Sequence, residues 1–171
     1  MKKIFAVLLA AIMALTLGGC TRAKWTTEPD EELGGLTITG WWGWGAEQTE
    51  IGDVLEIPSQ IGEKPVYSIG DRAFYFSDVS GVIISEGIKK IGYCAFKKCY
   101  SLVSVNIPSS VTEISEYAFQ SCSKLESIVI PDGVTVIGED AFSGCVDIVV
   151  TYKGNTYDFE HINDLYAAIN G

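Results

Sequence analysis

The side chains of this chain with the widest scope for chemistry are five cysteines and a single histidine, His161. Thiols and imidazoles bind metals, form disulfides, and act as nucleophiles or bases. The cysteines and His161 do not have the spacing of a known metal site, and no serine–histidine–aspartate set can be assembled around His161. We therefore expect no metal centre, no cofactor and no catalytic residue, and we interpret His161 as a surface or cap residue.

Three of the cysteines, Cys99, Cys122 and Cys145, recur at equal intervals of about 23 residues along the chain. In an exported protein they are candidates for disulfides. Three equivalent thiols cannot pair symmetrically, so a buried ladder of small apolar thiols is the favoured interpretation. Cys94 belongs to another column, whose remaining members are Arg72, Tyr117 and Asp140. Because those are surface residue types, we expect Cys94 to be exposed.

The interval belongs to a repeat whose copies begin at Val79, Leu102 and Leu125. They share the pattern L-x-x-V-x-I-P-x-x-V-x-x-I-G-x-x-A-F-x-x-C. Such a period indicates a stack of supersecondary units that bury one continuous core. The alternating start of each copy predicts a strand that ends at a proline such as Pro108 or Pro131. Acidic residues after the Ile-Gly turn predict a short helical turn, and the Ala-Phe column should fill the interior.

An altered copy precedes these three, with its strand at 54–58 and its turn at 68–74. It is five residues longer, so we expect a loop near residues 62–65. The alternating segment before it, 36–40, predicts the N-terminal strand cap that such a stack needs. A strand at 148–152, a turn at 153–156 and a closing helix then form the C-terminal cap. The repeat domain is thus predicted at 36–147 and the C-terminal cap at 148–171.

These columns closely resemble the BspA-type leucine-rich repeat family of bacterial surface proteins. The motif IP…IG…AF…C carries the resemblance over roughly residues 36–147, with departures at Ser77, Ser85 and Ser115. It implies an α/β leucine-rich repeat solenoid, that is, a short right-handed β-solenoid with short helical turns. It also implies a protein without enzymatic activity that serves adhesion or protein–protein contact. Family members are often far longer, so this chain offers a small binding face.

The N-terminus has the layout of an export signal. Lys2 and Lys3 precede an apolar run that ends at Leu17 and is too short to span a bilayer as a mature helix. The stretch LGGC that ends at Cys20 resembles the lipobox of bacterial lipoproteins; the alternative is an ordinary secretory signal near a cysteine. The resemblance implies removal of residues 1–19 and a diacylglyceryl group on Cys20, hence an extracytoplasmic, membrane-anchored protein at the cell surface. Residues 20–35 are then an acylated cysteine with a polar, flexible tether.

A cluster of tryptophans, Trp41, Trp42 and Trp44, lies between glycines after the N-terminal strand. On a loop, these rings would form a stacking platform for sugars, which makes an envelope or host glycan a candidate partner. Alternatively they cover the N-terminal end of the core, because tryptophan has a large apolar body. The sequence favours the cap and leaves the glycan platform open.

The outward positions of the strands are small and mostly uncharged. Their candidate ligand-binding residues are Glu56, Ile83, Ser104, Asn106, Ser127 and Val129. They lack the Trp, Tyr and Arg clusters of binding hot spots, but a protein ligand fits such a face. The net charge of −10 argues against nucleic acid and against a bare anionic bilayer as partner. The partners expected are therefore a protein or a glycan at the cell envelope, and the membrane itself only through Cys20.

Overall fold

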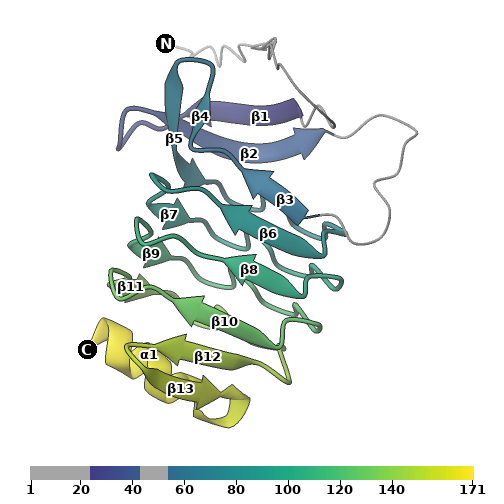
Figure 1. Cartoon of the computed structure of the whole chain (residues 1–171), viewed down its shortest axis with the longest axis vertical. Coiled ribbons are helices and arrows are strands. Elements are labelled where there is room, and N and C mark those ends of the chain that lie inside the picture. Colours follow the sequence, from purple (N-terminus) through teal and green to yellow (C-terminus); the bar gives the residue numbers. More distant parts are fainter. Residues whose placement is uncertain (1–23, 43–53) are drawn as a thin grey trace, which may run out of the picture.

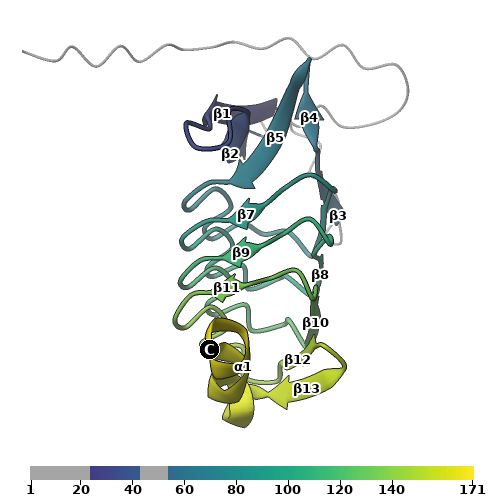
Figure 2. The same ribbon diagram turned by 90° about the vertical axis from the view of Figure 1, so that its left-hand side faces the viewer.

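The computed structural model describes residues 24–42 and 54–171, and within them the side chains of Trp41 and Trp42 are left out. Cys20 and Trp44 lie outside the described residues. The chain winds into a β-solenoid whose stacked turns each contribute two short strands (Figures 1 and 2). The two strands of a turn lie on opposite walls, and the apolar core runs between the walls along the whole stack.

The first strands of successive turns form one wall, which we call the strand wall: β3 (Val54–Ile57), β6 (Gly81–Ile84), β8 (Ser104–Asn106), β10 (Ser127–Ile130) and β12 (Val149–Tyr152). They run parallel, with β3-β6-β8 and β10-β12 hydrogen-bonded and β8 in contact with β10. The opposite wall contains β5 (Lys64–Ile69), β7 (Lys90–Ile91), β9 (Glu113–Ile114) and β11 (Val136–Ile137), also parallel. The predicted insertion is the hairpin of β4 (Gln60–Ile61) with β5, which turns at Gly62 with φ +63°.

The short helical turn predicted after each Ile-Gly pair is wrong. The Ile of each pair ends a strand of the second wall, and the following residues form hydrogen-bonded turns. Their N–H groups point to the next turn of the solenoid: Phe74, Phe96 and Phe119 each donate to an alanine carbonyl there, at 2.8 Å. A helix would use these groups within its own segment. These N–H groups instead form hydrogen bonds between successive turns of the solenoid, which satisfies the equivalent backbone groups in every turn of the stack.

The phenylalanine column is the centre of the core, as predicted. Phe74, Phe96, Phe119 and Phe142 stack face to face with centroids 5.0, 5.3 and 5.6 Å apart and planes within 6° of parallel. Each is at most 1% exposed. This nearly regular spacing of identical side chains follows from the repeat, because each ring stacks on its equivalent in the neighbouring turn.

The ladder of thiols is also present. Cys99, Cys122 and Cys145 are fully buried and free, and each Sγ–H donates to the carbonyl of a phenylalanine in the preceding turn at 3.1–3.2 Å. Contacts among the three thiols, together with burial, raise the pKa of Cys122 far above its usual range. The contact with Cys122 lowers the pKa of Cys99 and of Cys145, while burial keeps all three thiols out of contact with solvent. The column therefore fills space in the core and closes hydrogen bonds between turns.

The expectation that Cys94 is exposed is wrong, because Cys94 is 2% exposed. It has a left-handed backbone, φ +55°, like Arg72, Tyr117 and Asp140 in the same column. Around it Arg72 lies 5.7 Å over the ring of Tyr93, which meets the ring of Tyr117 edge to face at 5.8 Å. Cys94 therefore has the backbone conformation of the other residues in its column. Its short side chain is buried, however, because the longer side chains of its neighbours cover it.

The flexible tether predicted for residues 20–35 is wrong from residue 24 onward. Strand β1 (Lys24–Pro29) pairs antiparallel with β2 (Leu36–Trp42), the predicted cap strand, and β2 pairs in parallel with β5. Trp25 of β1 meets the ring of Phe74 edge to face at 6.3 Å. The first phenylalanine of the stack is therefore covered by a residue that the sequence placed in the tether.

Asp30 holds the turn between β1 and β2. Its carboxylate accepts hydrogen bonds from the backbone N–H of Leu33 at 2.9 Å and from the hydroxyls of Thr37 and Ser68 at 3.1 and 2.6 Å. Burial opposes ionisation of this group, but the hydrogen bonds, that from Ser68 foremost, outweigh it and hold the pKa of Asp30 below its ordinary value. The contact ties β1 to the buried hydroxyl of Ser68 in β5.

The C-terminal cap contains the predicted strand β12, an additional antiparallel strand β13 (Asn155–Asp158), a 3-10 turn (Phe159–His161) and helix α1 (Ile162–Asn170). Helix α1 closes the stack beneath β11 (Figure 2). It supplies the partners that a further turn would have given: Asn170 accepts from Ile137 N–H at 2.9 Å and donates to its carbonyl at 2.8 Å. The hydroxyl of Tyr166 accepts from Phe142 N–H at 3.1 Å.

The phenylalanine column should dominate stability. We expect Phe119→Ala to lower the free energy of unfolding by about 3–5 kcal/mol, because it removes a fully buried ring from a close-packed stack. Val136→Ala, at an exposed position of β11, is the control and should change it by less than about 0.5 kcal/mol. Urea denaturation followed by circular dichroism measures both, and equal effects of the two changes would contradict the assignment of the core.

The contribution of the Asn170 side chain to stability should be measurable apart from that of helix α1. Asn170→Ala leaves both backbone groups of Ile137 without their partners and should destabilise the protein by about 1–3 kcal/mol. Asn163→Ala, an exposed position of the same helix, is the matched control and should be nearly neutral. Hydrogen exchange at Ile137 N–H should speed up in the first variant alone; unchanged protection there would refute the capping role.

Candidate binding surface

The outward side chains of the strand wall form two straight columns. In the register of the sheet, Val54 lies opposite Gly81 and then Ser104, and Ser127 lies opposite Val149. The second column contains Glu56, Ile83 and Asn106, followed by Val129 opposite Thr151. The structure thus brings together the six strand residues predicted as ligand contacts. That they bind a ligand stays a prediction.

Four large apolar side chains of the strand wall are exposed to solvent. Val129 is 64% exposed, Val54 is 54% exposed, and Ile83 and Val149 are each 41% exposed. Glu56 is the one charged residue in the two columns, in a chain with a net charge of −10. Gly81, by contrast, is buried, since an added Cβ would lie 3.1 Å from Val54 and 3.2 Å from Ser104. The side chains of Val54 and Ser104 therefore lie close over the glycine.

The prediction from the sequence did not include the last part of this surface, because it assigned the strand that is now β12 to the C-terminal cap. Val149 and Thr151 extend the two columns by one strand, and β13 adds Asp158 and Thr156 opposite them. The alternation of exposed and buried residues in β12 repeats that of β10. Continuing the repeat pattern past residue 147 would have revealed the extension.

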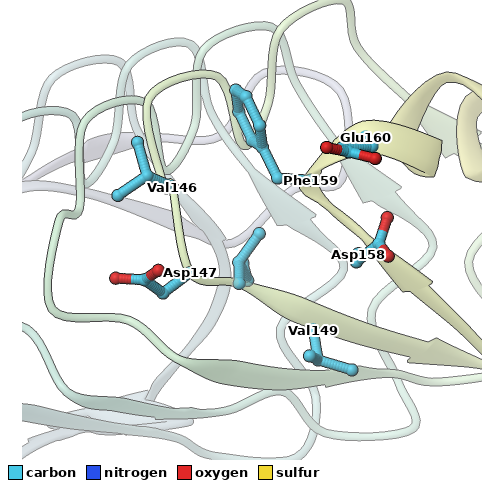
Figure 3. Close-up of a pocket in the computed structure, with 7 residues that line it drawn as sticks. Val146, Asp147, Val149, Asp158, Phe159 and Glu160 are labelled. Atoms are coloured by element: carbon cyan, nitrogen blue, oxygen red, sulfur yellow. The ribbon is translucent and has the colours of Figure 1, made fainter.

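A hollow of about 300 Å³ lies at the C-terminal end of the strand wall (Figure 3). Its exposed apolar residues are Val146, Val149 and Phe159, each at least 39% exposed, and the buried Ile148 also lines it. In Figure 3, Val146 and Asp147 belong to the turn before β12, and Phe159 belongs to the segment after β13. Val149 is shared with the first column, so the hollow continues the wall.

Carboxylates surround this hollow: Asp147, Asp158 and Glu160. Asp158 pairs with His161 through Nδ1 at 2.6 Å and also accepts from its backbone N–H at 3.0 Å. These hydrogen bonds lower the pKa of Asp158, and the same pair raises the pKa of His161. Both groups are exposed, so solvent screens the effect. The hollow has an apolar floor and an acidic rim, which suits a basic side chain with an aliphatic stem.

The remaining predictions from the sequence concern metal ligands, His161, membrane-spanning segments and the tryptophans. Among residues 24–42 and 54–171, no group of three or more His, Cys, Asp or Glu residues is placed to hold a metal ion. His161 is exposed at the start of α1. No helix in the described part of the chain has the length and hydropathy to cross a membrane. Trp41 and Trp42 belong to β2 and Trp44 lies outside the described residues, so the glycan platform stays a prediction.

The chain is similar to known leucine-rich repeat proteins. The model of the BspA type leucine-rich repeat region matches residues 55–162 with six copies. No curated protein matches the chain. Among solved structures, a leucine-rich repeat protein from Bacteroides capillosus is 29% identical, with a TM-score of 0.66 over 79% of this chain and 98% of that one.

Two further structures are similar. The leucine-rich repeat protein of T. pallidum is 25% identical, with a TM-score of 0.58 over 74% of this chain and 67% of that chain. A leucine-rich repeat protein from Bacteroides ovatus is also 25% identical, with a TM-score of 0.50, over 77% of this chain but 40% of its own length. The resemblance therefore covers the repeat architecture of this chain, including its strand wall.

Proposed function

Because the chain belongs to the BspA-type leucine-rich repeat family, we propose that it is a binding module without enzymatic activity that contacts a protein through its strand wall. Proteins of leucine-rich repeat families generally serve as interaction modules. The observation that carries the proposal is the exposure of Val54, Ile83, Val129 and Val149 on one wall of the solenoid. Exposed apolar residues gathered on one face, rather than scattered singly, mark interaction sites.

The shape and charge of the wall narrow the kind of partner. Five strands at about 4.8 Å spacing give a face roughly 20 Å wide, which suits an interface at the small end of the range. The two columns carry one charge, Glu56, whereas the hollow beyond Val149 has three carboxylates on its rim. A partner that fits both has an apolar strip and a basic group at its end.

The proposed location is the outer face of a membrane, held by lipid on Cys20. The support is the short h-region followed by the LGGC stretch. Strand β1 begins at Lys24, so the folded part starts within about 15 Å of Cys20 even if the intervening chain is fully extended. The N-terminal end of the solenoid would then lie at the bilayer, and the acidic hollow would lie at the end away from it.

The wall should crosslink to its partner in envelope membranes of the source bacterium. We expect a photoreactive phenylalanine at Val129 or Ile83 to give the same discrete adduct, because both lie on the proposed interface. The control position is Lys124, an exposed residue in the turn before β10. A second comparison is Val129→Asp, which should abolish the adduct formed from position 83 while leaving the fold unchanged. Adducts that form equally from position 124, or that survive Val129→Asp, would refute the proposal.

Anchoring should depend on one thiol. The wild-type chain, expressed in a bacterium, should partition into the detergent phase and carry the mass of a diacylglyceryl group on Cys20. Cys20→Ala should move the protein to the aqueous phase, because the change removes the thiol that would carry the lipid. Mass spectrometry of the N-terminal peptide gives the second readout. Equal partition of both proteins into detergent would show that the anchor is not lipid on Cys20.

A further inference from the structure

A second surface feature is separate from the strand wall and was not predicted from the sequence. Three aromatic side chains, Tyr75, Phe76 and Tyr100, are 42%, 63% and 46% exposed. They lie in the turns that lead into β6 and β8, at the edge of the stack where the arrows of these strands begin in Figure 1. Phe76 and Tyr100 meet edge to face with centroids 5.7 Å apart.

Phe76 is at an unfavourable position for a large side chain. Its backbone is left-handed, φ +60°, and the equivalent residues of later turns are Lys98, Ser121 and Gly144, with φ of +63°, +62° and +78°. This region favours glycine, and a bulky residue there is strained. Burial does not compensate, because most of the ring faces solvent. Stability alone therefore does not account for a phenylalanine at position 76, and strain of this kind gathers at functional sites.

Polar groups accompany the rings. A hollow of about 260 Å³ is lined by Phe76, Ser77, Asp78, Lys98 and Tyr100. The ammonium of Lys98 lies 5.7 Å from the ring centre of Tyr75, and contact with Tyr75 raises the pKa of Lys98, so the group is cationic. Asp78 accepts a hydrogen bond from Ser101. The hollow thus presents aromatic surface beside one hydrogen-bond-donating cation and one accepting carboxylate.

We propose that this hollow binds the pyranose ring of a neutral polysaccharide. The C–H groups of a sugar face carry partial positive charge and pack on the negative face of an aromatic ring. Asp78 and Lys98 contribute opposite charges, so the hollow favours neither an anion nor a cation. A neutral ring rich in hydroxyl groups uses both, because each hydroxyl donates to the carboxylate or accepts from the ammonium. A few polar groups among apolar lining are typical of small-molecule sites, although this hollow lies below their usual size and suits a single ring.

The residues that line this hollow include none of the strand-wall columns and none of the tryptophans at 41, 42 and 44. It needs none of the residues that the protein-binding proposal uses, so either proposal can fail alone. A protein partner that inserts a side chain between Phe76 and Tyr100 is the competing occupant, and the experiment must separate it from a sugar.

The test uses the full mature chain in a detergent that contains no sugar, with three probes: the hexasaccharides of N-acetylglucosamine, mannose and glucose. We expect saturation-transfer NMR and calorimetry to show binding of at least one of them. Phe76→Gly and Tyr100→Ala should each weaken that affinity tenfold or more. Phe76→Gly should also leave the unfolding midpoint unchanged or raise it, because it relieves the left-handed strain, and this readout excludes loss of binding through unfolding.

Two matched variants act as controls. Tyr117→Ala removes a partly buried ring from the Tyr93–Tyr117 pair, the same kind of edge-to-face contact outside the hollow, and should leave affinity within twofold. Trp44→Ala should likewise leave it unchanged. Absence of binding to all three sugars, full affinity in Phe76→Gly, or loss of affinity in Trp44→Ala alone would each overturn the proposal. A protein adduct from a photoreactive residue at position 100, with no sugar binding, would assign the hollow to a protein partner instead.

Discussion

Pairing between turns is the constraint on which this structure depends. No turn of the solenoid satisfies all of its backbone groups by itself: Phe96 N–H donates forward to the carbonyl of Ala118, while Gly92 N–H donates backward to the carbonyl of Ile69 at 2.8 Å. Each turn therefore needs a neighbour on both sides, and the register between neighbours places equivalent residues directly over one another. The stacked rings and the thiol ladder are consequences of that register. So are the close approaches at Gly92 and Gly138, where an added Cβ would overlap the backbone of the preceding turn.

A stack with this property needs both ends closed, and the chain closes them in different ways. At the N-terminal end, β1 adds an antiparallel strand, Trp25 covers the first ring, and Asp30 connects the hairpin to Ser68. At the C-terminal end, side chains replace a missing turn, since the amide of Asn170 pairs with Ile137 as a further strand would. Unpaired backbone groups and open strand edges invite association with other chains, so these caps protect the two ends of the solenoid, and the proposed binding surfaces lie on its sides.

Function in such a scaffold lies in the residues that differ between turns. The inward columns are nearly constant, whereas the outward ones change from Ile83 to Asn106 to Val129 in successive strands. Likewise, the left-handed column holds phenylalanine in one turn and glycine in another. Conserved geometry with variable side chains gives independent sites on one rigid frame: an apolar wall with an acidic end, and an aromatic hollow at another edge. Each proposal concerns a place where a side chain departs from what the repeat alone requires.

The repeat period alone determined the solenoid, the phenylalanine core, the buried thiols and the residues of the strand wall, because each of these is a property of a column. A column is visible in a sequence whenever its members recur at equal spacing. Tertiary structure decided what is not periodic: the burial of Cys94 beside longer neighbours, the pairing of β1, and the contacts of Asn170 and Tyr166 with backbone groups far along the chain. It also decided that the segment after each Ile-Gly pair is a turn and not a helix. These outcomes depend on which donor finds which acceptor in a neighbouring turn, and local residue preferences do not contain that information.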